Sequence, residues 1–489
     1  MKRMTLKPII RQALVLGVAL CLHLQAGAQI TNSLYFMHGV PQSNRINPAN
    51  QPKCGLYLGF PALAPLRMEV ASSSLAWEDI IYPHPTQDSL IFFTHPLGDK
   101  QAFLDQLSPV NYVISDLGTS LASIGFRTPV GFFSLDVTTR IDGAVYYPRD
   151  LARLILYGAG EGQSFQFDGL GVDFSVFNEA SLGWSASIMD NLQVGARAKM
   201  LFGVANLSTT KSELSLSTSK AQWNIRSDMM LNVSLPFADL QYDQEGMIDT
   251  MMLDNDLEDF PFSVPGYLFN FGNPGLGLDV GVNYRPIESL LLSASAVDIG
   301  FISWKDGVHD VAYDMDYDFE GIEINPFDFS DDFTLGDYLD STFSQLADSL
   351  SGFVRFTEGR SYSRRLNTKL YLGASYFLTP NINFGILSRT DFLDGEISQQ
   401  FTATANLTTG RFINLTLSYS VMNSYYKNLG AGLSFNVGPL NLYLISDNVL
   451  NGVFWPQEVQ SANLWFGMNL VFGYKKFMQQ QYTDRPLVY

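Results

Sequence analysis

Residues 461–474 read SANLWFGMNLVFGY, and apolar side chains occupy every second position of this stretch. The even positions carry the apolar set and the odd positions are mostly polar or glycine: Ala462, Leu464, Phe466, Met468, Leu470, Phe472 and Tyr474 against Ser461, Asn463, Gly467, Asn469 and Gly473. Because successive side chains of a β-strand point to opposite faces, one face of this strand is apolar and the other polar. A tilted strand of this length can cross a hydrocarbon layer of about 30 Å. The stretch therefore predicts a membrane-crossing strand.

The same alternation returns along most of the chain, which predicts a whole sheet of such strands. It is found at 133–145, 179–188, 192–203, 276–284, 368–378, 382–386, 413–421 and 431–437. Short turn sequences separate neighbouring runs, as at Asp190-Asn191, Thr379-Pro380-Asn381 and Gly438-Pro439. We therefore predict an all-β fold, a transmembrane antiparallel β-barrel of about 14 strands over residues 54–474. The even number follows the rule for single-chain bacterial barrels.

A soluble β-sandwich would also alternate, and the composition of the polar face argues against it. That face is dominated by Gly, Ser and Asn, with scattered charges that suit a barrel interior better than a solvated surface: Arg140, Arg197, Lys199, Asp279, Arg285, Lys369 and Arg389. Several runs are also longer than the roughly five or six residues usual in soluble sheets.

The first 28 residues have the features of a secretory signal peptide. Four basic residues precede an apolar run over 13–24, and Ala26-Gly27-Ala28 resembles a cleavage site. We expect cleavage before Gln29 and a final location in the outer membrane. The apolar run is shorter than the about 20 residues that a membrane-spanning helix needs.

Charge and cysteine content exclude two classes of protein. Removing residues 1–28 leaves 26 of the 30 basic residues against 48 acidic ones, a formal charge of −22. Because phosphate backbones attract basic surfaces, nucleic acid is not an expected partner. Cys54 is the one cysteine of the mature chain, so we expect no intramolecular disulfide.

Several segments do not fit the barrel wall. Residues 29–53 contain Pro41, Pro48 and Pro52 without alternation, and we expect an irregular arm within or across the barrel. Residues 236–274 and 306–365 are acidic insertions expected to be long extracellular loops, and 475–489 a C-terminal tail. Short helices are predicted at 149–157 and, from apolar residues at helical spacing, at 335–350.

No catalytic, cofactor or metal site is predicted. The mature chain has four histidines and lacks the motifs of serine nucleophiles, zinc proteases and phosphate-binding loops. Asp314, Asp316 and Asp318 could bridge a calcium ion, but their spacing fails the EF-hand pattern because Phe319 stands at its glycine position. The stronger interpretation is one polar face of a strand that extends beyond the membrane. We therefore expect a non-enzyme.

Three phrases carry a resemblance to known barrels. Asn47-Pro48-Ala49 resembles the motif near the mature N-terminus of the long-chain fatty-acid transporter family, the FadL-like proteins. Residues 295–304 and 441–448 are similar to phrases in uncharacterised outer-membrane barrels of Bacteroidota, which are related to FadL-like and PorV-like barrels. The resemblance implies a 14-stranded barrel with an N-terminal hatch in the lumen and hydrophobic ligands that enter from outside. The two acidic insertions depart from the apolar loop surface of a fatty-acid transporter.

Two functions of different classes follow as expectations. The first is passive transport of small hydrophobic molecules through a plugged barrel. In it, the hatch residues Asn47, Pro48 and Ala49 move, and loop aromatics contact the ligand: Phe262, Tyr267, Phe269 and Phe271. The alternative is a non-transporting barrel that serves as a secretion-machinery accessory or a surface scaffold. Expected partners are outer-membrane lipid and lipopolysaccharide, the barrel-assembly machinery during insertion, and either hydrophobic small molecules or a secretion or surface protein.

Overall fold

The computed structural model describes most of the chain between residues 32 and 473. The described residues are 32–59, 66–84, 86, 88–220, 222–242, 248–253, 266, 268–319, 352–393, 397–409, 412–422, 425–448 and 461–473. The expected signal peptide, the helix predicted at 335–350 and the C-terminal tail lie outside these residues.

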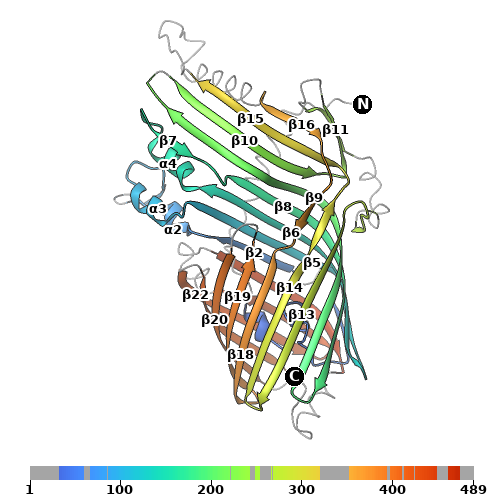
Figure 1. Cartoon of the computed structure of the whole chain (residues 1–489). Helices are drawn as coiled ribbons and strands as arrows, with labels where there is room; N and C mark the ends of the chain where they lie inside the picture. Colours follow the sequence, from blue (N-terminus) through green and yellow to red (C-terminus); the bar gives the residue numbers. More distant parts are fainter. Residues whose placement is uncertain are drawn as a thin grey trace.

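Antiparallel strands close into one barrel of 14 strand positions (Figure 1). Thirteen positions are single strands, in pairing order β5 (Val110–Thr128), β6 (Gly131–Pro148), β8 (Gly171–Met189), β9 (Leu192–Thr218), β13 (Pro274–Ile287), β14 (Leu290–Trp304), β18 (Thr368–Thr379), β19 (Ile382–Phe392), β20 (Ile397–Thr409), β21 (Ile413–Met422), β22 (Tyr425–Val437), β23 (Leu440–Ser446) and β24 (Ser461–Phe472). The fourteenth is shared by β1 (Leu56–Gly59) and β2 (Leu66–Ser72), which both pair with β24 on one side and β5 on the other. The predicted fold and strand number are confirmed.

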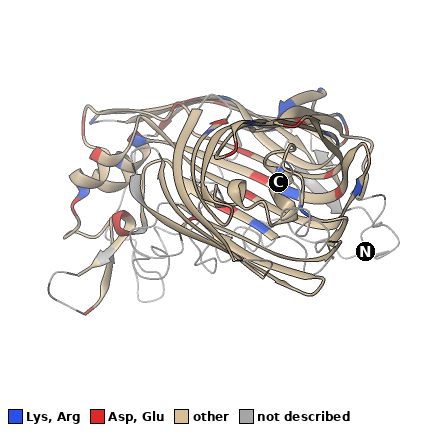
Figure 2. Ribbon diagram, turned by 90° about the horizontal axis from the view of Figure 1, so that it is seen from below, with Lys and Arg blue, Asp and Glu red and all other residues tan. Residues whose placement is uncertain are grey.

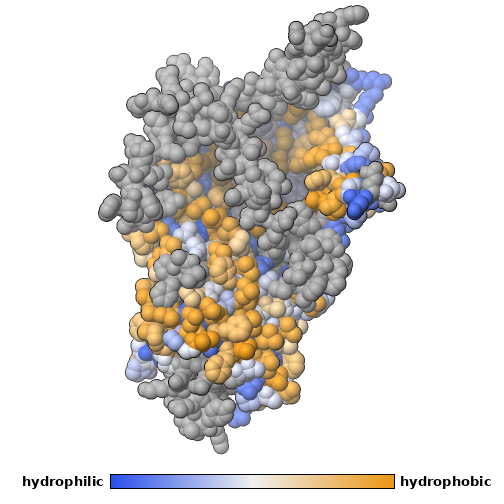
Figure 3. Space-filling model, turned by 180° about the vertical axis from the view of Figure 1, so that it is seen from behind, coloured by the Kyte–Doolittle hydropathy of each residue, from blue (hydrophilic) through white to orange (hydrophobic). Residues whose placement is uncertain are grey.

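The barrel is apolar outside and polar inside, the reverse of a soluble protein. In β20, Ile397 and Phe401 are 65% and 58% exposed, whereas Ser398 and Gln400 between them and Thr402 beyond them are buried. On the face seen in Figure 3, hydrophobic residues cover much of the lower half of the molecule. Since exposed apolar area of this extent is unfavourable in water, lipid is the medium that this surface fits.

The two ends of the barrel differ. Two-residue turns join β6 to β5, β9 to β8, β14 to β13, β19 to β18 and β23 to β22 at the lower end of Figure 1. Short turns face the periplasm in outer-membrane barrels, so the upper end is extracellular. The strand boundaries at Asp190-Asn191, Thr379-Pro380-Asn381 and Gly438-Pro439 confirm those predicted turns.

An extracellular extension continues the sheet above the barrel. Phe202 of β9 pairs with Pro274, the first residue of β13, and beyond this point β9 pairs instead with β10 (Trp223–Ser234). In turn, β10 pairs with β15 (Val308–Phe319), and β15 pairs with β16 (Val354–Glu358). Part of the predicted insertion at 306–365 is therefore strand. Asp314, Asp316 and Asp318 lie on one face of β15, which confirms the strand interpretation of their spacing.

Smaller elements cover the extracellular rim. They are α2 (Trp77–Ile80), β3 (Ile81–Pro83), β4 (Leu90–Phe92), α3 (Lys100–Gln106), α4 (Arg149–Tyr157), β7 (Ser164–Gln166), β11 (Ala238–Tyr242), β12 (Ile248–Leu253) and β17 (Tyr362–Arg365). α4 confirms the helix predicted at 149–157, and its Ala152 and Leu156 pack on Phe103 and Leu104 of α3. In the part of the chain that the structure describes, no helix is long and apolar enough to cross a membrane.

Candidate functional site in the lumen

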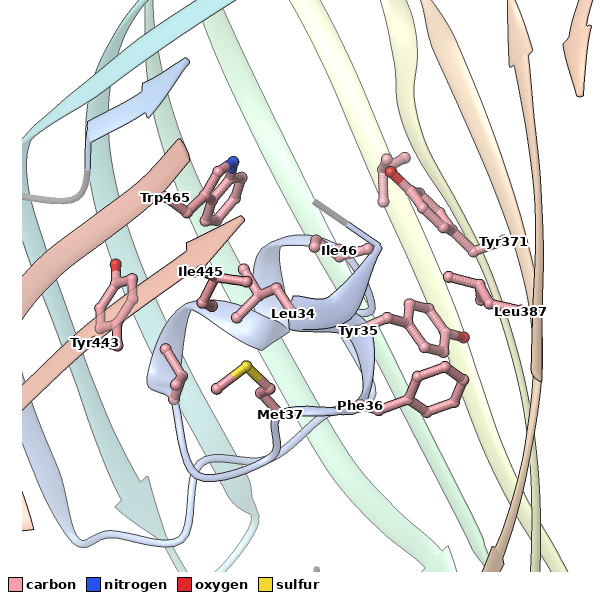
Figure 4. Packing of buried hydrophobic residues seen from close by; sticks show 12 residues of the cluster. Leu34, Tyr35, Phe36, Met37, Ile46, Tyr371, Leu387, Tyr443, Ile445 and Trp465 are labelled. Carbon is pink, nitrogen blue, oxygen red and sulfur yellow. The ribbon is translucent and has the colours of Figure 1, made fainter. Parts of the chain in front are cut away.

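The N-terminal arm lies inside the barrel as a plug (Figure 4). Residues 32–53 form two short 3-10 helices, η1 (Ser33–Phe36) and η2 (Pro41–Arg45), joined by turns. One face of the arm packs an apolar cluster against the wall: Leu34, Tyr35, Phe36, Met37, Val40 and Ile46 of the arm with Val297, Tyr371, Leu387, Tyr443, Ile445 and Trp465 of the barrel. All twelve are at most 7% exposed, so the arm is packed into the lumen like a core segment.

Glycines in five wall strands make room for the arm. A Cβ at Gly373, Gly385 or Gly432 would come within 2.8 Å of Tyr35, 2.9 Å of Phe36 and 2.6 Å of Met37, respectively. At Gly195 and Gly281 it would overlap Pro48 and Asn47 more severely. Side chains larger than glycine at these positions would push the arm from its seat. The wall sequence is therefore fitted to the plug.

The hatch motif lies between β9 and β13, where these last two glycines face each other. The Asn47 side-chain oxygen accepts a hydrogen bond from the Ala49 amide at 3.0 Å, which closes the turn. Its Nδ2 donates to Asn283 Oδ1 at 3.0 Å and to the Tyr35 hydroxyl at 3.3 Å. Asn47, Pro48 and Ala49 thus fix the fold of the arm and its contact with the wall together.

Two aspartates of the barrel bind the two ends of the arm's helical segment, which comprises η1 and η2. The Asp447 carboxylate accepts the backbone N–H groups of Asn32 and Ser33. Asp136 pairs with Arg45 at 2.7 Å, and its other oxygen lies 3.5 Å from Arg197. Charge-assisted bonds of this kind are shorter and stronger than neutral ones, so these contacts are the polar anchors of the plug.

Above the plug lies a layer of charged residues, which several strands of the barrel contribute (Figure 2). It consists of Arg45, Arg67, Arg140, Arg197, Lys199, Lys369 and Arg389 with Glu69, Asp116, Asp136, Asp142, Glu179, Asp279, Asp298 and Asp391. Asp298 is at its centre, 2.8 Å from Arg140 and 2.6 Å from Lys199. A cavity of about 70 Å³ remains within the layer and reaches Arg45 of the plug.

The backbone bends to place Asp298. Among the described residues it is the one non-glycine residue with positive φ, 61°. Its amide donates to Asp279 Oδ1 at 2.7 Å, beside the register shift between Leu278 and Val280. Asp and Asn tolerate this left-handed conformation better than other side chains. The bend turns one carboxylate toward three cations, since Lys369 also lies 3.7 Å away.

The charges singled out from the sequence occupy this layer with one exception. Arg140, Arg197, Lys199, Asp279, Lys369 and Arg389 belong to it. Arg285 instead lies at the periplasmic turn, where it donates to the Glu288 carbonyl at 2.7 Å and stacks on Phe377. The pairing partners were not predictable, because they come from strands far apart in the chain.

Between the charged layer and the extracellular mouth, the lumen is lined by an apolar cluster. It comprises Phe177, Leu201, Ile302, Trp304, Val308 and Leu366, with Tyr362 packed against it. The Trp304 ring lies over Gly203 of β9, another position where a Cβ would not fit. A cavity of about 310 Å³ follows toward the outside, beside Tyr146, Asp173 and Arg364.

The structure separates the predicted loop aromatics from these cavities. Phe269 and Phe271 pack edge-on against Phe202, with ring centroids 5.3 and 5.2 Å apart, and are not among the residues that line the cavities described above. Phe262 and Tyr267 lie outside the described residues. A ligand role for these four remains a prediction.

Several solved structures are similar to this chain at low identity. The Ralstonia pickettii toluene transporter TbuX is 10% identical, covers 88% of this chain and 94% of its own, and has a TM-score of 0.38. A Pseudomonas aeruginosa FadL homologue is 9% identical with coverages of 92% and 99% and a TM-score of 0.39. The Pseudomonas putida toluene transporter TodX is 9% identical with coverages of 91% and 95% and a TM-score of 0.34. The barrel fold is defined by the strand pairing described above.

Curated proteins give no match to this chain. A family model does match, over residues 48–447, which include Pro48 and Ala49 of the hatch motif and every barrel strand except β24. Its description is a family of unknown function, DUF5723, and the chain belongs to that family.

Proposed function

We propose that this outer-membrane barrel is a plugged channel for the passive passage of small hydrophobic molecules. The observation that carries the proposal is the seat of the arm: five wall glycines and two aspartates hold a separate segment inside the lumen. A barrel that served only as a scaffold would have no need of a removable filling. The contacts that hold the arm are non-covalent, so its movement requires no bond to be broken in the chain.

The lumen above the plug offers a stepwise path. A molecule from outside meets first the 310 Å³ cavity and then the cluster around Phe177 and Trp304. Apolar and aromatic linings of this kind bind ring-sized or aliphatic molecules by removing their surface from water. Below, the charged layer and the plug close the way, and both share Arg45. Movement of the arm would therefore disturb the charged layer as well.

Further parts of the proposal concern the route to the membrane. A cleaved leader over residues 1–28 would direct export, and the barrel-assembly machinery would insert the strands. Lipopolysaccharide would then surround the outer part of the apolar surface. No step of the proposal requires catalysis.

Uptake by Gram-negative cells tests the proposal, because their lipopolysaccharide leaflet slows apolar molecules. We expect cells that produce this chain to take up the apolar dye N-phenyl-1-naphthylamine faster than cells that do not. Entry of a polar dye of similar size should be unchanged. Equal rates for the apolar dye in both cell types would contradict the proposal. Recovery of a stoichiometric secretion or surface protein with the barrel from solubilised membranes, combined with equal dye uptake, would favour the scaffold alternative.

A further inference from the structure

A short segment closes the lumen a second time, on the extracellular side. β17 pairs with the upper end of β14, but two of its side chains reach past β13 to other strands. Arg364 forms an ion pair with Asp173 of β8 at 2.6 Å, and the Tyr362 hydroxyl donates to Asn206 of β9 at 2.6 Å. Leu366, which follows, is part of the apolar cluster beneath. We call residues 362–366 the outer gate.

The 310 Å³ cavity lies directly against the ion pair of this gate. Arg364, Asp173 and Lys211 are the charged residues of its lining, and Lys211 is already paired with Asp228 and Glu213, which leaves Arg364 as the cation that faces a carboxylate within the lining. Val110 and Leu170 supply apolar surface on another side. The volume falls at the lower end of the range of about 300–1,000 Å³ found for small-molecule sites.

The ion pair is placed where a ligand can compete for it. The side chains of Arg364 and Asp173 are 20% and 24% exposed, whereas those of Arg140 and Asp298, a central pair of the charged layer below, are both 5% exposed. A partly solvated pair is cheaper to exchange than a fully buried one, because neither charge is left without water. The planar guanidinium fits a carboxylate by two parallel hydrogen bonds, which makes an incoming carboxylate a direct substitute for Asp173.

We propose that this cavity binds small organic acids, with Arg364 binding the carboxylate and the aliphatic side chains holding an apolar body. Occupation of Arg364 by the ligand takes it from Asp173 and so detaches the outer gate from β8. The inference deepens the proposed function by naming a substrate class for the outer cavity. Binding of the substrate would then break the ion pair between Arg364 and Asp173 that holds the outer gate closed.

Calorimetric titration of the purified, detergent-solubilised chain with benzoate and benzamide tests the inference. The two probes have nearly the same shape, and only benzoate is charged. We expect native protein to bind benzoate at least tenfold more tightly than benzamide. Arg364→Gln should abolish this preference, whereas Asp173→Asn should strengthen benzoate binding severalfold because it removes the competing carboxylate. Arg226→Gln, which removes an exposed ion pair of the extension, is the matched control and should change neither affinity.

Equal affinities for the two probes in the native protein, or weaker benzoate binding in Asp173→Asn, would overturn the inference. Asp173→Asn keeps the test decisive if Arg364→Gln fails to fold. The proposed function is tested separately: normal uptake of the neutral dye without a benzoate preference defeats only the inference. Benzoate preference without dye uptake defeats only the proposed function.

Discussion

The hydroxyl of Ser33 in the arm lies 2.7 Å from the hydroxyl of Ser418 in β21, although the two residues are 385 positions apart. Both are buried, and the Asp447 carboxylate lies beside them. The first residues of the plug therefore contact the barrel wall directly through their side chains. The position of the arm can therefore be fixed or released by changes at named contacts.

The glycine seat gives the first prediction. Gly281→Ala adds a Cβ that overlaps the Asn47 amide and comes within 3.1 Å of the Ala49 nitrogen, so the hatch motif should leave its place. We expect a cysteine at position 49 to react with a water-soluble maleimide at least tenfold faster in this variant, in a Cys54→Ala background. Gly266→Ala is the control, because no atom lies within 4 Å of that position. Unchanged labelling in Gly281→Ala would show that the arm is not seated there.

The anchor between Arg45 and Asp136 gives the second. Arg45→Gln leaves the buried Asp136 carboxylate with the Ser123 hydroxyl and the more distant Arg197, and loss of the charged partner of a buried pair costs about 3–5 kcal/mol. We expect a lower unfolding temperature in detergent, read from the heat-dependent mobility of the barrel on gels. Adding Asp136→Asn removes the stranded charge and should restore part of the loss. No rescue by the double variant would mean that Arg45 acts through packing instead.

The lipid-facing side of the wall gives the third. Phe401 is 58% exposed in the middle of β20, and a lysine at such a position costs about 2–4 kcal/mol at the centre of a bilayer. Phe401→Lys should reduce the yield of folded barrel in membranes, while Phe401→Leu should not. Folding yield is measured by protease resistance after insertion into vesicles. Tolerance of the lysine would contradict the orientation of β20.

Much of the wall was predictable because its physics is local. Alternation at 192–203 or 276–284 identifies each strand separately. Because these strands are long enough to cross a membrane, they predict a transmembrane barrel. The same alternation cannot distinguish a strand of the barrel wall from a strand of the extracellular extension. In β15, Tyr313 and Met315 alternate with aspartates in the same way as lipid-facing and lumen-facing residues alternate in the wall strands. Part of an insertion predicted as loop is therefore sheet.

The site was predictable only in outline. Arg140, Lys199 and Lys369 stood out as charges on a barrel's inner face, but that they share Asp298 depends on strands brought together by closure. The positive φ of Asp298 has no sequence signal of its own. In the sequence, the glycines that face the arm resemble the small residues of any barrel lumen. That they make room for the arm is evident only from the structure. The outer gate at 362–366 carries no motif.

Cross-linking the arm to the wall tests the central claim most directly. In a Cys54→Ala background, the pair Ser33→Cys and Ser418→Cys should form a disulfide, because the two hydroxyls are 2.7 Å apart. The pair Thr390→Cys and Gln399→Cys, at directly opposite positions of neighbouring strands, joins β19 to β20 within the wall and serves as the matched control. We expect oxidation of the first pair to lower apolar-dye uptake to the level of cells without the protein, with recovery on reduction, and oxidation of the second to leave uptake unchanged. Full dye uptake with the arm cross-linked would contradict the account.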